Sequence, residues 1–252
     1  MHIFQRGRAL LVALGLGLSV APGLHAQSTY DITKAQITFD PGNILAYINY
    51  PGINGGTGRQ QVRVGRTILT GTDDHGNKLQ IPSFCIDIFD PLQAGVFVSS
   101  DIASSGYDAT RLTNIETFLE HADLLAVDAD STAAVQIGIW EIMNEAAGTP
   151  WNTTSGTFFV NGVQSPAADA LANSWLANLA SHDWKPDPAF SLEVLVPQGV
   201  NQAQVRLVAG NAQGIPAVPE PASWALMVGG FGLVGGTLRR RKVSYGKPAS
   251  TL

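Results

Sequence analysis

The chain has 252 residues, which is enough for one compact domain of ordinary size but not comfortably for two. Charged residues make up 14% of it, and seven of its 15 basic residues lie in the two terminal segments. Apart from these seven, the chain has eight basic and 20 acidic residues, a net charge of −12, which excludes proteins that bind nucleic acid through a basic surface.

Residues 1–26 have the pattern of a secretory signal peptide. A basic start, an apolar stretch over residues 9–20 and a Pro-Gly helix breaker precede a cleavage site that we expect after Ala26. Leu24 is larger than the residue usually found three positions before such a cut, so neighbouring cleavage sites stay open. A short anchor that is never cut is the alternative. The pattern predicts an exported protein.

Strand-like segments follow between about residues 30 and 98. Segments 46–50, 61–64, 67–69 and 84–89 are rich in β-branched and aromatic residues, and turn sequences with Gly, Pro, Asn and Asp separate them. The low charge content and the 27 Gly and 14 Pro residues are typical of a loop-rich exported protein that contains strands.

Helical periodicity then begins. Thr113 and Glu116 have the spacing of a capping box, which predicts a helix start at this point. The apolar stripe of this helix is expected to consist of Ile115, Phe118, Leu119 and Leu124.

Two more helices and a return to strands complete the body of the chain. Helices are expected over 131–146 and 165–179, and strands over 190–196 and 205–208. This order predicts an α+β fold, namely a β-rich sandwich or barrel-like domain over residues 27–213 with a helical insertion.

The end of the chain combines three features in a fixed order. An uncharged stretch over residues 222–238 is barely long enough, at 1.5 Å per residue, to cross a hydrocarbon core of about 30 Å as a transmembrane helix. The basic cluster that follows it would keep residues 243–252 in the cytoplasm. The motif before the stretch is Val218, Pro219, Glu220 and Pro221, and the cluster after it is Arg239, Arg240, Arg241 and Lys242.

These features resemble the PEP-CTERM sorting signal of Gram-negative bacteria, here over residues 214–242. The resemblance implies processing by exosortase, a membrane-embedded cysteine protease, in bacteria that make exopolysaccharide. It also implies a protein that is anchored in the inner membrane transiently and then reaches the cell surface or the extracellular space. An ordinary tail anchor is the alternative, and it does not require the Pro-Glu-Pro motif.

Cys85 is the single cysteine, so an intramolecular disulfide is impossible. A lone thiol in an exported protein is expected to be buried or chemically committed. Some fifty residues later, Gln136 lies on an expected helix. The 3.6-residue period places Ile139, Trp140 and Met143 on the same face as Gln136.

The segments around Cys85 and Gln136 resemble the Cys and Gln motifs of thioester domains in Gram-positive surface adhesins. The resemblance implies that the thiol and the carboxamide condense, with loss of ammonia, to an internal thioester that captures an amine on another protein. Gly138 departs from the motif, which usually has Ala there, and Val135 stands where the motif often has Thr. The expected pocket residues are Phe84, Asp87, Ile139, Trp140 and Met143.

Three functions follow as expectations. The first is a non-enzymatic adhesion protein of the surface or biofilm matrix, without cofactor or metal, that binds a surface protein or an exopolysaccharide. The second is a purely structural, exopolysaccharide-associated surface protein with the same fold and a free, buried Cys85. The third is a secreted polysaccharide hydrolase that uses Asp87 and Asp90, although their odd spacing in a strand would place them on opposite faces.

Overall fold

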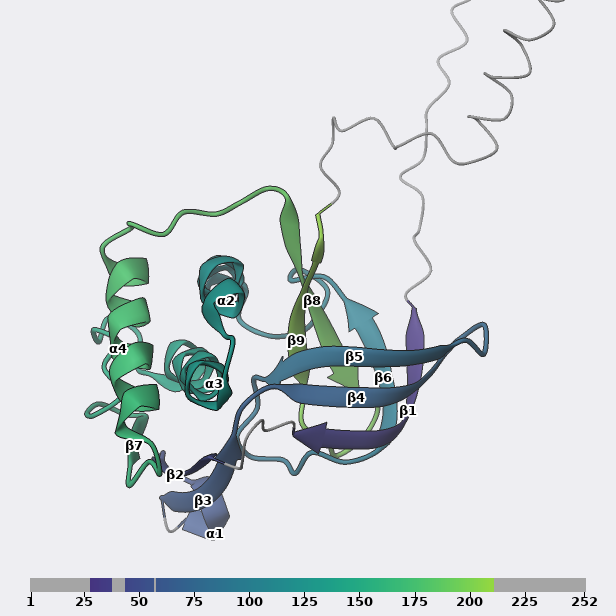
Figure 1. Cartoon of the computed structure of the whole chain (residues 1–252). Helices are drawn as coiled ribbons and strands as arrows, with labels where there is room; N and C mark the ends of the chain where they lie inside the picture. Colours follow the sequence, from purple (N-terminus) through teal and green to yellow (C-terminus); the bar gives the residue numbers. More distant parts are fainter. Residues whose placement is uncertain (1–27, 38–43, 57, 211–252) are drawn as a thin grey trace, which may run out of the picture.

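Six antiparallel strands close into a barrel (Figure 1). The computed structural model describes residues 28–37, 44–56 and 58–210. The strand order around the barrel is β1-β4-β5-β9-β8-β6, and β6 pairs with β1. Of the sandwich and the barrel expected from the sequence, the structure therefore has the barrel. The strands are β1 (Thr29–Ile37), β4 (Thr67–Asp73), β5 (Lys78–Cys85), β6 (Gly95–Ser100), β8 (Phe190–Pro197) and β9 (Gln204–Ala209).

Apolar side chains fill the middle of the barrel. Because successive residues of a strand point to opposite faces, one alternate set from each strand meets inside. Leu69 of β4 and Ile81 of β5 are direct cross-strand partners in this layer. The buried cluster consists of Ile32, Leu69, Ile81, Phe97 and Leu195.

A second sheet, a short helix and three longer helices lie beside the barrel (Figure 1). The sheet has the antiparallel order β3-β2-β7, and a short helix, α1, links β2 to β3. All three longer helices lie between β6 and β8, so the expected helical insertion is present. The elements are β2 (Ile44–Asn49), α1 (Ile53–Gly56), β3 (Arg59–Val64), α2 (Ala109–Leu125), α3 (Ala129–Asn144), β7 (Phe159–Asn161) and α4 (Pro166–Ala180).

Helix α3 is the central element, because it contacts α2, α4, β5 and the second sheet. It begins with a capping box in which Asp128 accepts a hydrogen bond from the backbone N–H of Ser131, and the Ser131 hydroxyl accepts one from the backbone of Asp128. Eleven of its 16 residues are buried. The large apolar content of this segment thus reflects burial on several sides rather than on one stripe.

Helix α2 begins earlier than the sequence predicted. Asp108 caps it by accepting a hydrogen bond from the backbone N–H of Arg111, while Thr113 lies inside the helix and donates to the carbonyl of Ala109. The prediction of a start at Thr113 was wrong because Glu116 does not bond back to it. Instead, Glu116 accepts from the backbone N–H of Leu192 in β8.

The apolar stripe of α2 was predicted correctly except at its end. Ile115, Phe118 and Leu119 are buried, whereas Leu124 is 72% exposed. Leu124 belongs to the last turn of the helix. A periodic pattern alone therefore placed one apolar residue too many in the core.

The strand predicted over residues 84–89 ends at Cys85. Strand β9 pairs with β5 only at Phe84 and Cys85, and a loop begins after them. The backbone N–H of Ile86 still donates to the carbonyl of Ala203. Because Asp87 and Asp90 lie in this loop, the strand alternation that was used against a carboxylate pair does not apply.

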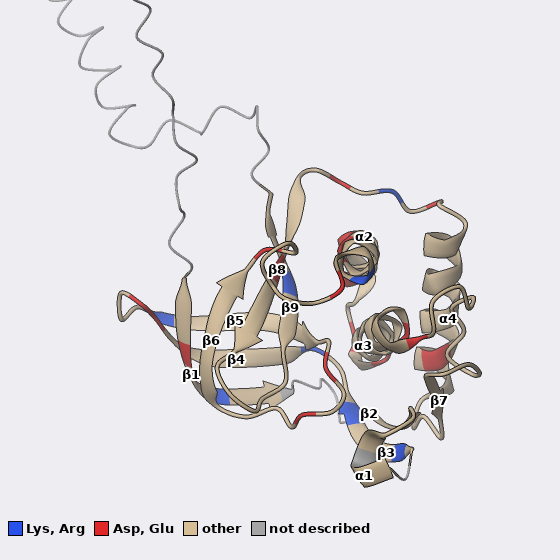
Figure 2. Cartoon of the chain, turned by 180° about the vertical axis from the view of Figure 1, so that it is seen from behind, with Lys and Arg blue, Asp and Glu red and all other residues tan. Residues whose placement is uncertain are grey.

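The predictions made for the two ends of the chain lie outside the described residues. These are the signal peptide, the motif at 218–221, the transmembrane stretch at 222–238 and the basic cluster at 239–242. Within the described ranges, none of the helices combines the length and the apolar character needed to cross a membrane. In Figure 2, the few Lys and Arg residues of the described part are scattered over strands, α2 and the segment before β8.

Candidate functional site

Cys85 and Gln136 lie in direct contact where β5 meets α3. Strand β4 pairs with β5 only as far as Ser83, so within the described part of the chain no strand pairs with the backbone of Cys85 on that side. The Gln136 carboxamide takes this place. Its Oε1 accepts from the Cys85 backbone N–H at 2.9 Å, and its Nε2 donates to the Cys85 carbonyl at 2.7 Å. The two residues that the sequence singled out are thus brought together by the tertiary structure.

Both partners are shielded from water. Cys85 is 3% exposed and Gln136 is 1% exposed. A buried carboxamide is stable only when its polar atoms are hydrogen-bonded, and the Cys85 backbone supplies one donor and one acceptor for this purpose. The pair therefore has fixed relative positions.

The thiol of Cys85 has its own set of neighbours. Its Sγ accepts a hydrogen bond from Gln204 Nε2 at 3.0 Å, and Thr67 Oγ1 lies 3.8 Å away. Burial raises the pKa of the Cys85 thiol to about 11, although the hydrogen bonds of Gln204 and Thr67 act in the opposite direction. At neutral pH the sulfur is therefore a neutral, buried thiol.

A pocket of about 280 Å³ reaches this pair from outside the barrel. Trp140 lies one helical turn after Gln136 and lines the pocket with it. The indole Nε1 of Trp140 is buried and has no hydrogen-bond partner among the described residues. The full lining is Ile48, Gln60, Gln61, Val62, Arg63, Gly65, Cys85, Ile88, Asp90, Pro91, Leu92, Gln136, Trp140 and Gln202.

The other expected pocket residues, Phe84, Asp87, Ile139 and Met143, do not line this pocket. Phe84 points to the opposite face of β5 from Cys85 and lines a separate pocket next to Arg66. Ile139 is fully buried in the main core, and Met143 packs against that core. Asp87 is half-buried in the loop after β5, where burial raises its pKa and the Phe89 backbone N–H donates to its carboxylate.

Three residues of the thiol environment were not found from the sequence. Gln204, Ser83 and Thr67 all contact Cys85 or each other inside the barrel. They are far from Gln136 along the chain and belong to three different strands. Each of them is a polar residue whose side chain points into the barrel, which could have marked it as a site residue. Which strand positions point inward is known only once the strand register is known.

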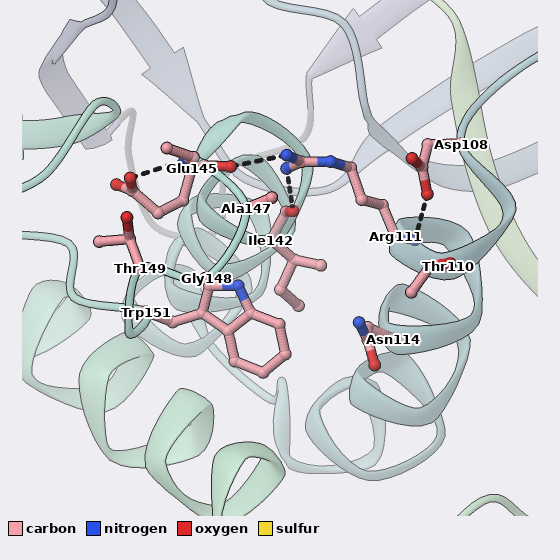
Figure 3. A pocket seen from close by; sticks show the side chains of 11 residues that line it. Asp108, Thr110, Arg111, Asn114, Ile142, Glu145, Ala147, Gly148, Thr149 and Trp151 are labelled. Atoms are coloured by element: carbon pink, nitrogen blue, oxygen red, sulfur yellow. Dashed lines mark hydrogen bonds between the residues drawn. The ribbon is translucent and has the colours of Figure 1, made fainter.

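A second pocket, of about 370 Å³, lies between α2 and the end of α3 (Figure 3). Arg111 is its only basic lining residue, and its guanidinium donates to the carbonyls of Ile142, Met143 and Glu145. Trp151 forms the opposite wall. Because the guanidinium binds the last carbonyls of α3, it holds the helix end in place.

Two buried carboxyl groups, Glu141 of α3 and Glu145 directly after it, organise the segment that follows this helix. Glu141 accepts from the backbone N–H of Asn152, and Glu145 accepts from those of Thr157 and Phe158. Burial raises the pKa of Glu141 to about 7, with the negative charge of Glu145 as a further cause. Its second oxygen, Oε2, has no partner among the described residues.

The raised pKa of Glu141 predicts a pH-dependent stability. The folded protein holds a proton on Glu141 that the unfolded chain releases near pH 4.5, so this group's stabilising contribution is present at acid pH and is lost as pH rises from about 4.5 to about 7. Glu141→Gln should therefore stabilise the protein by about 1 kcal/mol at about pH 8 and have little effect at about pH 5. Urea unfolding at both pH values measures this. Asp31→Asn, at an exposed carboxylate, is the control, and an equal effect of Glu141→Gln at both pH values would contradict the prediction.

One cluster of metal-ligating groups occurs in the described part of the chain. Asp73, Asp74 and His75 lie together at the turn between β4 and β5. The carboxylate of Asp73 already accepts from the backbone N–H groups of His75 and Asn77 and from the Asn77 side chain. These bonds form the turn, and they account for the lowered pKa of Asp73.

The comparisons with known proteins concern the tail and the fold separately. A family model described as the PEP-CTERM protein-sorting motif matches residues 217–242. The motif implies an exported protein that passes through the membrane, is processed by exosortase and is sorted to the cell surface. No curated protein matches the chain significantly. Among solved structures, the N-terminal thioester domain of a surface protein from Clostridium perfringens aligns with 66% of this chain and 100% of that chain, at 8% identity and a TM-score of 0.36.

Proposed function

We propose that this exported protein forms an internal thioester between Cys85 and Gln136 and uses it to bind a neighbouring surface protein or exopolysaccharide covalently. The observation that carries the proposal is the reciprocal pair of hydrogen bonds between the Gln136 carboxamide and the Cys85 backbone, at 2.9 and 2.7 Å. A reaction between two side chains is greatly accelerated when their relative positions are fixed in advance.

The condensation needs no external reagent. Cys85 Sγ attacks Gln136 Cδ, the Cδ–Nε2 bond breaks, and the thiol proton leaves with the nitrogen as ammonia. The Cys85 backbone N–H, which donates to Gln136 Oε1, is positioned to stabilise the negative charge that develops on this oxygen. The same N–H can serve again when an amine attacks the thioester carbonyl.

The surroundings of the pair suit a bond that water destroys slowly. Cys85 and Gln136 are almost fully buried, and Trp140 and Ile48 are among the apolar side chains that line the pocket leading to them. Exclusion of water protects reactive intermediates from hydrolysis. A partner that enters the pocket would displace the remaining water before the reaction.

Each molecule would react once, so the proposed role is stoichiometric capture and not enzymatic turnover. The amine forms an amide with Gln136 Cδ, the Cδ–S bond breaks, and the sulfur takes up the amine's proton. The sorting tail supports this role, because exosortase processing would follow a transient stay in the inner membrane and would present the domain at the cell surface.

A structural surface protein with a free Cys85 is the second candidate. One observation favours it: the bonds of the Gln136 carboxamide satisfy the Cys85 backbone and would be valuable without any reaction. The high pKa of the thiol also keeps it unreactive as long as it is buried.

Intact mass spectrometry of the full-length chain, purified in mild detergent, separates the two candidates. The thioester predicts a mass short by one ammonia and, after treatment with methylamine, the addition of one methylamine to Gln136. The addition does not depend on processing of the chain ends, so it is the safer readout. Cys85→Ala and Gln136→Ala should show neither change. A wild-type protein with full mass, no methylamine addition and one titratable thiol would contradict the thioester and leave the structural role.

A further inference from the structure

A second buried glutamine approaches Cys85 from the opposite side to Gln136. Gln204 is the first residue of β9 and the direct cross-strand partner of Cys85. Its side chain is fully buried, and its Nε2 lies 3.0 Å from Cys85 Sγ. The cysteine is thus held between two carboxamides, one at its backbone and one at its sulfur.

The orientation of the Gln204 amide is determined by its other partners. Ser83 Oγ donates to Oε1 at 3.2 Å, and Nε2 also donates to the carbonyls of Gln202 and Ala203 at 3.3 and 3.2 Å. A flipped amide would place Oε1 against these two carbonyl oxygens, and an amide oxygen carries no hydrogen that it could donate to them. The nitrogen must therefore face the sulfur.

A polar group at this depth is costly unless it is fully bonded. Leu195, the partner of Gln204 on β8, belongs to the apolar layer of the barrel. An aliphatic side chain would fit such a site without any hydrogen-bonding requirement. The sulfur of Cys85, whose other polar neighbour, Thr67 Oγ1, lies at the longer distance of 3.8 Å, explains why an amide donor is placed here.

We propose that Gln204 is a positioning residue that holds the Cys85 sulfur and stabilises it whenever it carries negative charge; this inference rests on the proposed function of the Cys85–Gln136 pair. During condensation, the sulfur develops negative charge as its proton passes to the departing Gln136 nitrogen and the new bond to Cδ forms. During capture, the Cδ–S bond breaks and its electron pair returns to Sγ before the amine's proton arrives. In both steps the Gln204 N–H donates to the charged sulfur.

A hydrogen bond to a charged atom is about twice as strong as one between neutral groups. The thiol has a pKa of about 11, so roughly one sulfur in ten thousand is a thiolate at neutral pH. Removal of the donor should reduce this fraction by about tenfold or more. The rate of condensation and the rate of reaction with methylamine should fall by a similar factor.

The test compares Gln204→Met, which keeps the length of the side chain but not its donor, with the exposed Gln80→Met on β5 as control. The first readout is the absorbance of the Cys85 thiolate, titrated up to about pH 11. All variants carry Gln136→Ala here, so that the thiol stays free, and the absorbance of the matching Cys85→Ala protein is subtracted. The second readout is the rate of methylamine addition in the full-length chain. Circular dichroism and the melting temperature report whether each variant is folded, and Ser83→Ala, which frees the Gln204 amide, provides a milder second variant.

The expected result is a thiol pKa about one unit higher in Gln204→Met, at least tenfold slower methylamine addition, and no change in Gln80→Met. An unchanged thiolate titration in the folded Gln204→Met or Ser83→Ala protein would overturn the inference. The inference would also be overturned if Gln204→Met lost methylamine addition while Gln136→Ala kept it. Gln204 would then itself be the acyl partner of Cys85. A wild-type protein without any methylamine addition would refute the thioester, yet the titration would still decide whether Gln204 supports the sulfur.

Discussion

Gly138→Ala should lower the stability of the protein by about 2 kcal/mol, although alanine is the better helix former. A Cβ at position 138 would overlap the ring of Phe118, whose Cε1 would be only 2.9 Å away. Phe118 is fully buried in α2 and packs against Trp184, with ring centroids 5.9 Å apart, so its ring has little room to move. The clash therefore outweighs the gain in helix propensity of about 1 kcal/mol.

The substitution also tests the candidate site, because Gly138 lies two residues after Gln136. Relief of the clash by a shift of α3 would displace the Gln136 carboxamide relative to Cys85 and should reduce methylamine addition. Thermal unfolding should show a melting temperature lower by about 6 °C. Phe118→Leu alone creates a cavity, but in the double variant it should remove most of the clash. Additive effects of the two substitutions would show that Phe118 is not the reason for glycine at this position.

Arg111→Met should destabilise the protein by about 3 kcal/mol. The guanidinium donates to three carbonyls at the end of α3, at 2.7 to 2.8 Å, and these groups have no partner within the helix. Figure 3 shows two of these bonds, to the carbonyls of Ile142 and Glu145. Its positive charge also complements the partial negative charge of the helix end. Methionine keeps much of the apolar side chain and removes only the donors and the charge.

Urea unfolding at neutral pH measures this effect, and Arg63→Met, at an exposed arginine of β3, is the matched control with an expected change below about 0.5 kcal/mol. Because α3 carries Gln136, the loosened helix end should also raise hydrogen exchange in the last turn of α3. A loss of stability no greater than that of the control would mean that water replaces the arginine at these carbonyls without cost.

The order of the elements was predictable because each local pattern has its own physical cause. The helices predicted over 131–146 and 165–179 correspond to α3 and α4, and the strands predicted over 190–196 and 205–208 correspond to β8 and β9. Boundaries were less predictable. Thr113 and Glu116 matched a capping box, yet Asp108 caps α2, because a short spacing rule does not contain the tertiary partner that Glu116 finds on β8.

The candidate site was predictable in its two central residues and not in its surroundings. A single cysteine in an exported chain and a glutamine in an apolar helical segment stand out in the sequence, and the fold brings them into contact. The residues that surround this pair were less predictable. Phe84 was assigned to the pocket because it adjoins Cys85, but neighbours in a strand point to opposite faces. Gln204 had no visible connection to Cys85 until the register of β5 and β9 was known.

The sequence by itself determined the features that depend on neighbouring residues only: the C-terminal sorting motif, the acidic body, the helical and strand periods, and the choice of Cys85 and Gln136. Only the tertiary structure decided that six strands close into a barrel, that β4 stops short of Cys85, and that Gln136 and Gln204 reach this cysteine from opposite sides. The physical reason is that the pairing of β5 with β9 joins residues more than a hundred positions apart, such as Cys85 and Gln204. Such pairing depends on the packing of the whole core, which no local pattern contains.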